Sequence, residues 1–417
     1  MITRRWMMKT TGLTAGAAVL APTVFGAPVS GNVEALAEAA GAGEPAAKSS
    51  EIPSWGLGPF VRDDGADHIG ARAESVFACP VIGKVIPWEN KDVLCAAAVV
   101  KNGKVFLYYR AEDKSRGESW GTSRIGLAVS EDGRQFKRHP EPVLYPGNDF
   151  MKEYEWPGGC QDPRVAQAED GSYVMTYTAW DGQFARLCCA TSKDLYKWTK
   201  HGLAIGTCHK GKYRDFWSKS GSIVCRREGS RFIAERINGK YWMYFNDSGL
   251  MLATSDNLTD WDVVEDESGK HLTVLPMRPG GIDSVVTEGG PPAFLTDKGI
   301  FMIYNAGANG RPDLHPASED LSAGTPDLGL TGTVWAAAQA LFDPKDPAKL
   351  LQRMDHDFFH PERDFEIKHA GSAEGGNSNV TFVESLVWFN QAWRFYYGCA
   401  DSIVASAVYQ PHQAMKK

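Results

Sequence analysis

The feature that most limits the fold of this chain is a segment that recurs three times. Residues 127–136, 189–198 and 252–261 share the pattern A-x-S-x-[DN]-[GL]-x-x-[FW], and their alanines lie 62 and then 63 residues apart. A fixed period of this length is typical of architectures that repeat one supersecondary unit. The period fits a unit of four antiparallel strands that ends in a turn capped by Ser and Asp side chains.

Each copy follows a segment rich in aromatic and β-branched residues, which favour strands. Each of these segments begins after an Asn-Gly or Asp-Gly pair, which is typical of tight hairpins. The expected strands are residues 104–110, 173–179 and 241–245. Further strand-like segments leave room for about two more units, at residues 299–304, 333–341 and 393–397. The sequence therefore predicts an all-β fold, a five-bladed β-propeller. A β-sandwich is the competing architecture, but it does not require a recurring turn.

Composition and charge narrow the function classes. The chain has 43 glycines, 13 tryptophans, 14 tyrosines and 19 phenylalanines, which favour short strands and tight turns. A net charge of −7 argues against a nucleic-acid partner. No apolar run beyond the N-terminus is long enough to predict a membrane span. Eight cysteines form no C-x-x-C pair, so we predict no metal site and no cofactor, and we allow for one disulfide.

The N-terminus has the pattern of an export signal. Arg4 and Arg5 precede a weakly apolar run at residues 10–24, which is typical of a twin-arginine signal. We expect this signal to span residues 1–37, with cleavage between 27 and 40, and a flexible linker to span 38–54. Residues 55–417 would then form a single catalytic propeller domain. The predicted location is periplasmic or extracellular.

Three polar clusters stand at the ends of expected strands. Residues 109–113 carry an Arg and two carboxylates, and residues 158–165 place an Asp and an Arg around a proline after two glycines. Residues 286–293 place a Glu beside a Gly-Gly-Pro-Pro corner. Glycines allow close backbone approach, and a rigidly held Asp near an Arg suits acid–base chemistry. Two carboxylates across a scissile bond are what glycoside cleavage needs.

Ordered motifs over residues 80–408 resemble glycoside hydrolase family 130. They include R-x-E-D at 110–113, C-x-D-P-R-V at 160–165, G-G-P-P at 289–292 and F-Y-Y-G-C-A-D at 395–401. This family contains β-mannoside phosphorylases and β-1,2-mannosidases on a five-bladed propeller. The resemblance implies that Asp162 is the general acid, acting through the mannose 3-hydroxyl. Gln161 replaces the family's usual Glu.

The choice between phosphate and water as nucleophile depends on the family's phosphate-binding cations. Asn246-Asp247 and Asn305 stand where the resemblance implies an Arg and a His. The family's Lys aligns with Glu228 without gaps, or with Lys219 if an insertion is allowed. The gapped alignment is slightly preferred because it keeps the strand pattern that follows the Lys. In hydrolytic members carboxylates activate water, and Glu288 is the favoured candidate here, with Glu228 as the alternative.

We therefore predict an exported, inverting β-mannoside hydrolase that acts on an oligosaccharide or glycan. Its acid and base carboxyls are expected about 6.5–9.5 Å apart, or somewhat more if the acid acts through a relay. A phosphorylase of the same family is the first alternative, supported by Lys219, Arg164 and Arg186. A non-catalytic carbohydrate-binding propeller and a sialidase-like or family 43-like propeller are the others. The predicted substrate-binding residues are Arg110, Glu112, Asp113, Arg164, Lys219, Asn246, Asp247, Tyr304, Asn305 and Asp401.

Overall fold

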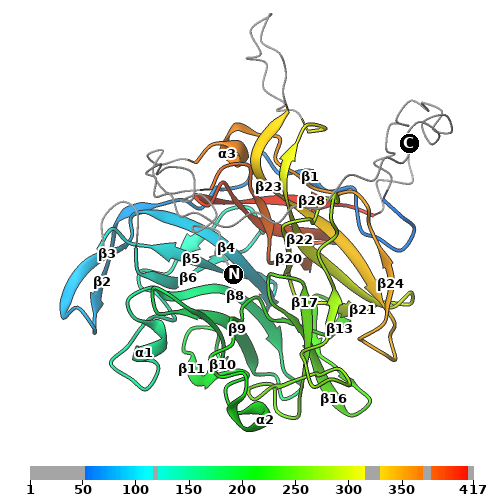
Figure 1. The fold of residues 1–417 in the computed structure, drawn as a ribbon. Coiled ribbons are helices and arrows are strands. Elements are labelled where there is room, and N and C mark those ends of the chain that lie inside the picture. The colour runs from blue at the N-terminus through cyan, green and yellow to red at the C-terminus, as the bar shows by residue number, and fades with distance from the viewer. Residues whose placement is uncertain (1–51, 116–120, 315–328, 370–376, 412–417) are drawn as a thin grey trace, which may run out of the picture. The chain divides into compact units, whose positions relative to one another are not determined.

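The computed structural model describes residues 52–115, 121–314, 329–369 and 377–411, and strands dominate them (Figure 1). The helices in these ranges are four residues long: α1 (Lys152–Glu155), α2 (Cys208–Gly211) and α3 (Asp364–Ile367). None of the helices in the described ranges could cross a membrane. The predicted all-β class is confirmed, and the export signal lies outside the described residues.

Five antiparallel units follow one another along the described chain. Each pairs its strands mostly in chain order, as expected for hairpins joined by short turns. The first is β4 (Asp92–Lys101), β5 (Lys104–Glu112), β6 (Ser123–Ser130) and β7 (Lys137–Arg138); the second is β8 (Gly159–Gln167), β9 (Tyr173–Trp180), β10 (Ala185–Ser192) and β11 (Thr199–Leu203). The third is β12 (Ser222–Ile223), β16 (Lys240–Phe245), β17 (Leu250–Ser255) and β18 (Asp262–Val263).

The last two units have a divided first strand. The fourth is β20 (Val286–Gly289) and β21 (Phe294–Leu295), then β22 (Ile300–Arg311), β23 (Leu330–Phe342) and β24 (Leu350–Arg353). The fifth is β25 (Thr381–Val383) and β26 (Val387–Phe389), then β27 (Ala392–Cys399), β28 (Ile403–Tyr409) and β1 (Val61–Arg62).

The recurring sequence segment forms the same turn each time. Ser130 Oγ accepts the N–H of Gly133 at 2.8 Å, and Asp132 Oδ1 accepts the N–H groups of Arg134 and Gln135. Ser192 with Asp194, and Ser255 with Asn257, make the corresponding bonds. The [GL] position is left-handed in all three turns, with φ of 75°, 78° and 70° for Gly133, Leu195 and Leu258. The predicted Ser- and Asp-capped turn is confirmed.

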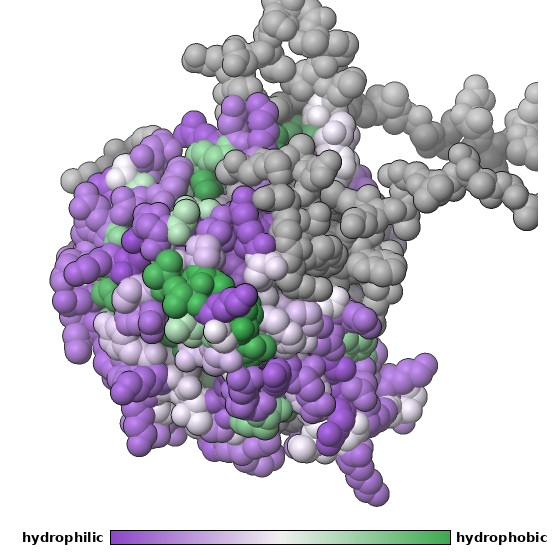
Figure 2. All heavy atoms as spheres, turned by 90° about the vertical axis from the view of Figure 1, so that its left-hand side faces the viewer, coloured by the Kyte–Doolittle hydropathy of each residue, from purple (hydrophilic) through white to green (hydrophobic). Residues whose placement is uncertain are grey.

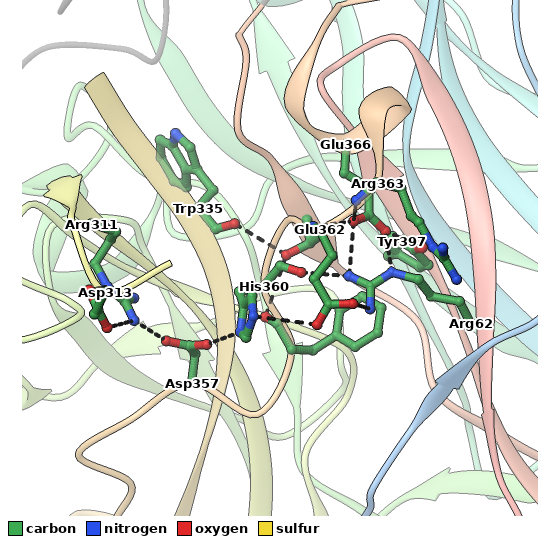
Figure 3. A network of polar contacts seen from close by, with 12 residues as sticks. Arg62, Arg311, Asp313, Trp335, Asp357, His360, Glu362, Arg363, Glu366 and Tyr397 are labelled. Carbon is green, nitrogen blue, oxygen red and sulfur yellow. Dashed lines mark hydrogen bonds and ion pairs between the residues drawn. The ribbon is translucent and has the colours of Figure 1, made fainter. Parts of the chain in front are cut away.

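Strand β1 joins the beginning of the described chain to its last unit. Val61 and Arg62 pair with Val408 and Ala407 of β28. Arg62 donates two hydrogen bonds to Glu366, at 2.7 and 2.9 Å, and Tyr397 of β27 donates to the same carboxylate (Figure 3). The network continues through Glu362, His360 and Asp357 to Arg311 of β22. Polar contacts thus tie the fifth unit, including β1, to the fourth unit.

The remaining strands form local additions. They are β2 (Arg72–Cys79) with β3 (Lys84–Glu89), β13 (Cys225–Glu228) with β14 (Arg231–Ala234), β15 (Arg236–Ile237) and β19 (Thr273–Leu275). Figure 2 shows a largely hydrophilic face with one group of apolar side chains. Val76 and Val85 of the β2–β3 hairpin are among the exposed apolar residues of the described ranges.

All eight cysteines lie in the described part of the chain, are buried, and form no disulfide. Cys188 and Cys189 are adjacent on β10, so their side chains point to opposite faces of the strand. The single disulfide allowed for in the sequence analysis is therefore absent among them. Burial raises the pKa of Cys189 to about 12, which keeps this thiol protonated.

Candidate active site

A bulge in β8 presents Asp162. The pairing of β8 with β9 shifts register between Gln161 and Arg164, and Asp162 adopts a left-handed backbone with φ 49°. The preceding Gly159 is packed so closely that a Cβ on it would lie 2.1 Å from the Ser123 carbonyl oxygen. The predicted close backbone approach is confirmed, and only glycine fits there. Asp162 is 3% exposed.

Two cations contact the Asp162 carboxylate. Arg110 Nη1 donates to Oδ1 at 3.0 Å, and Lys219 Nζ lies 3.3 Å from Oδ2. Arg110 also donates to Glu112 and, at 3.1 Å, to Ser123 Oγ. Burial disfavours the guanidinium charge, but Asp162 and Glu112 outweigh this effect and raise the pKa of Arg110. Arg110, near the end of β5, therefore holds Asp162 with a guanidinium group that stays charged.

Lys219 joins Asp162 to Glu288. Its Nζ lies 3.2 Å from Glu288 Oε1, and Ser220 Oγ donates to the same oxygen. With Asp162 Oδ2 at 3.3 Å on the other side, the two carboxylate oxygens are separated by at most about 6.5 Å. This bound reaches only the lower edge of the expected range of about 6.5–9.5 Å. One ammonium group holds these two oxygens together, and the predicted separation of the whole carboxyl groups stays a prediction.

Asp247 is a third carboxylate beside Lys219. The N–H of the preceding Asn246 donates to the Lys219 carbonyl at 2.8 Å, and Thr287 N–H donates to the Asp247 carbonyl. Burial raises the pKa of Asp247; the Lys219 charge lowers it and the Glu288 charge raises it. Asp247 and Glu288 therefore both experience the field of one lysine.

Arg164 fixes the backbone around the site rather than pointing to solvent. It donates to the Gly289 and Gly290 carbonyls at 2.6 and 3.2 Å, and to the Asp162 carbonyl at 3.1 Å. Its Nη2 lies 3.0 Å from Glu384 Oε1, and both side chains are almost fully buried. Arg164 thus ties the bulge of β8 to the strand that carries Glu288.

The sequence analysis did not single out Glu384. It follows β25, and one ligand atom each from Cys95, Asp162 and Glu384 lies within 4.8 Å of the other two. These residues face Arg110 or Arg164 rather than only one another, so charge pairing accounts for the cluster. A lone carboxylate within the apolar run 380–389 was the available sequence signal.

Two predicted substrate-binding residues form buried ion pairs at the strand end of β5. Glu112 lies 3.0 Å from Lys91 Nζ in addition to contacting Arg110. Asp113 lies 2.6 Å from Arg124 Nη1 and accepts the N–H of Thr122. Asp113 therefore stabilises the neighbouring chain segment, whereas Glu112 is linked to Asp162 through Arg110, which contacts both.

Four other predicted residues make contacts within the fold. Tyr304 donates to Asp283 inside an apolar cluster. Asn305 pairs with Glu288 across β20 and β22 and makes two hydrogen bonds with the backbone of Val383. Asn246 Nδ2 contacts the Met251 sulfur, and Asp401 accepts a hydrogen bond from Asn377.

Glu228 lies outside the site. It ends β13 in the β13–β14 hairpin, is 49% exposed, and pairs with Arg226 and Arg231. Its proposed role as a water-activating base is therefore corrected, since an exposed carboxylate held by two arginines does not face Asp162. The gapped alignment that prefers Lys219 agrees with the geometry.

Among the described residues, carboxylates outnumber cations at the site. Lys91, Arg110, Arg164 and Lys219 face five carboxylates: Glu112, Asp162, Asp247, Glu288 and Glu384. Each cation contacts at least one carboxylate at short distance. An anionic ligand would have to displace these partners, whereas the carboxylates are suited to accept hydrogen bonds from neutral hydroxyls or water.

Comparisons with known proteins identify the family of this chain. The model of glycoside hydrolase family 130, described as beta-1,4-mannooligosaccharide phosphorylase, matches residues 84–416. A 1,2-beta-oligomannan phosphorylase of Thermoanaerobacter sp. (strain X514) is 30% identical over 328 residues, covering 77% of this chain and 90% of its own length.

Solved structures of other proteins also resemble this chain over most of its length. A glycosyl hydrolase from Bacteroides ovatus is 40% identical, with a TM-score of 0.78 over 87% of this chain and 96% of its own. The same values describe a structure from work on family members that are glycoside hydrolases targeting beta-1,2 mannosidic linkages in Candida mannan. The chain belongs to glycoside hydrolase family 130.

Proposed function

We propose that this chain is a hydrolase of β-mannosides that uses water as its nucleophile. The observation that carries the proposal is the environment of Lys219, which lies between Asp162 and Glu288 with Asp247 nearby. A phosphate dianion at this lysine would meet three carboxylates, and such like-charge contacts are unfavourable. A neutral water molecule meets no such penalty.

Asp162 and Glu288 have different roles in the proposed reaction. Asp162 supplies the proton that the leaving glycosidic oxygen takes up, passed on by the mannose 3-hydroxyl as the family resemblance implies. Glu288 accepts a proton from the water that attacks the anomeric carbon from the opposite face. The carbon–oxygen bond to the leaving sugar breaks as the bond to water forms, so the released mannose has inverted configuration. Arg110 and Glu112 are suited to bind sugar hydroxyls.

β-1,2-Linked mannosides are the proposed substrates. The curated relative acts on a 1,2-beta-oligomannan, and one solved structure comes from work on hydrolases of beta-1,2 mannosidic linkages. The second candidate function is phosphorolysis of the same linkage, because that relative is a phosphorylase and Lys219 is present here.

Product analysis distinguishes the two. The protein is incubated with β-1,2- and β-1,4-linked mannobiose, with and without phosphate. Free α-mannose, formed at the same rate in both conditions and seen by NMR before mutarotation, is expected. Mannose 1-phosphate would overturn the proposal in favour of a phosphorylase. The absence of product from either sugar would favour a non-catalytic carbohydrate-binding protein.

Variants test the assigned roles. Asp162→Asn and Glu288→Gln are each expected to lower turnover at least about 100-fold, as is typical for loss of an acid or base. Glu228→Gln serves as the matched control because Glu228 lies on an exposed hairpin. Full activity in Asp162→Asn would contradict its assignment as the acid.

We also propose that the five units are the blades of one β-propeller, closed by β1. The pairing of β1 with β28 and the parallel contacts of β6 with β8 and β14 with β8 support this arrangement. Export through the twin-arginine route is proposed from the sequence. Replacing Arg4 and Arg5 by Lys is expected to abolish export, measured by cell fractionation.

A further inference from the structure

Trp217 makes a specific contact with the carboxylate group beside Lys219. Its indole Nε1–H donates to Asp247 Oδ2 at 3.2 Å, and Ser248 Oγ donates to Asp247 Oδ1 at 3.0 Å. Each oxygen of Asp247 therefore has a neutral donor. The indole N–H is the single polar group of a tryptophan side chain, and here it is directed at one carboxylate of the site.

The ring of Trp217 is held in place by its neighbours. It is 7% exposed and packs edge-on against Trp180 and Phe184, with ring centroids 5.9 and 5.6 Å away. The next residue, Ser218, donates its N–H to the Ala185 carbonyl and accepts the N–H of Leu187. The direction of the indole N–H is thus set by packing and by the backbone, not by Asp247 alone.

Charges on two neighbouring elements act on Asp247. Lys219, after α2, favours its ionised form, while Glu288 of β20 opposes it. On the fourth unit, Arg353 of β24 reaches Thr287 Oγ1 and Asp283. Burial raises the pKa of Asp247, and the hydrogen bonds from Trp217 and Ser248 act with Lys219 against that effect.

We propose that Trp217 is a positioning residue that holds the Asp247 carboxylate in its orientation beside Lys219 through the indole hydrogen bond. The proposal rests on the proposed hydrolytic function for its consequence in catalysis. A hydrogen bond to the charged form of a carboxyl favours that form. Loss of the indole N–H would let Asp247 take up a proton at higher pH, which removes a negatively charged partner of Lys219 from the site.

The pH dependence of kcat/KM on β-1,2-mannobiose tests this role. In Trp217→Phe, which keeps an aromatic ring and removes the N–H, the acidic limb is expected to move up by about one pH unit. Activity near the alkaline plateau should recover. Trp180→Phe is the matched control, since it alters the same aromatic cluster and Trp180 has no hydrogen bond to Asp247 among the described residues. An equal loss at every pH would show a merely structural role and overturn the proposal.

A readout without turnover separates this inference from the hydrolase assignment. In protein labelled with 5-fluorotryptophan, the ¹⁹F resonance of Trp217 is identified by its absence in Trp217→Phe. We expect this resonance to titrate with pH in the wild type and to lose that titration in Asp247→Asn. A resonance independent of pH would overturn the proposal. Failure of the wild type to hydrolyse mannobiose would instead refute the proposed function and leave this measurement interpretable.

Discussion

Removal of Arg62 is expected to destabilise the protein strongly, although Arg62 belongs to a strand of two residues. Its guanidinium makes two hydrogen bonds to Glu366, one to Glu362 and one to the His360 carbonyl. The side chain of Glu366 is 0% exposed and that of Arg62 is 10% exposed. In Arg62→Met the buried Glu366 carboxylate would lose its counterion and keep only neutral donors.

The magnitude follows from what remains around Glu366. Breaking a buried ion pair from one side costs about 3–5 kcal/mol. Tyr397 and the N–H groups of Glu362 and Arg363 still donate to Glu366, so the lower end is expected, about 3 kcal/mol. This corresponds to a change of about 100-fold in the unfolding equilibrium.

Urea unfolding followed by fluorescence measures this effect. Lys240→Met is the matched control, because its partner Asp256 is 70% exposed and Lys240 itself is 43% exposed. The control should change the unfolding free energy by less than about 1 kcal/mol. If the two variants were equally stable, burial would not be what determines the contribution of the Arg62–Glu366 ion pair to the free energy of unfolding. The double variant Arg62→Met/Glu366→Gln should recover part of the loss, because no unpaired charge remains.

Three further outcomes are expected. Burial opposes the ionised form of Asp357, but His360 and Arg311 outweigh it and lower the pKa of Asp357 to about 2. The ionised carboxylate therefore adds about 2 kcal/mol to the free energy of unfolding above about pH 4, and this contribution is lost as the pH falls through 2. Urea midpoints between pH 5 and 2.5 should accordingly vary less in Asp357→Asn than in the wild type. Ser192→Ala removes the acceptor for two backbone N–H groups of a repeated turn and should cost about 1–2 kcal/mol in urea unfolding, whereas an unchanged midpoint would contradict this role of the Ser. Because all eight cysteines are buried, 5,5′-dithiobis(2-nitrobenzoate) should modify none in the native protein and eight in guanidinium, and rapid modification of the native protein would contradict the described packing.

Local features of the fold could be predicted from the sequence. The turn at residues 130–136 is determined by a Ser, an Asp and a residue that tolerates positive φ, all within a few positions. The strands that precede the repeats, and the hairpin at Asn102-Gly103, follow equally from neighbouring residues. The close backbone approach before Asp162 was indicated by the two glycines, whereas the bulge that presents Asp162 was not predicted.

The composition of the site needed the tertiary structure. The choice between Lys219 and Glu228 depended on an alignment gap, and the contact of Lys219 with Glu288, 69 positions further along the chain, resolves it. Glu384 approaches Asp162 from the fifth unit, and Trp217 reaches Asp247 from a segment with no recognisable motif. Tyr304 and Asn305 have residue types suited to sugar binding, yet packing assigns them to the framework.

The sequence by itself determined the repeated turn and the all-β class, because these depend on contacts between residues close in the chain. The tertiary structure alone decided which carboxylates share Lys219 and that β1 pairs with β28, more than 340 residues away. Hydrogen bonds and ion pairs between distant segments form only after those segments are brought together by burial of their strands, so no local pattern encodes them.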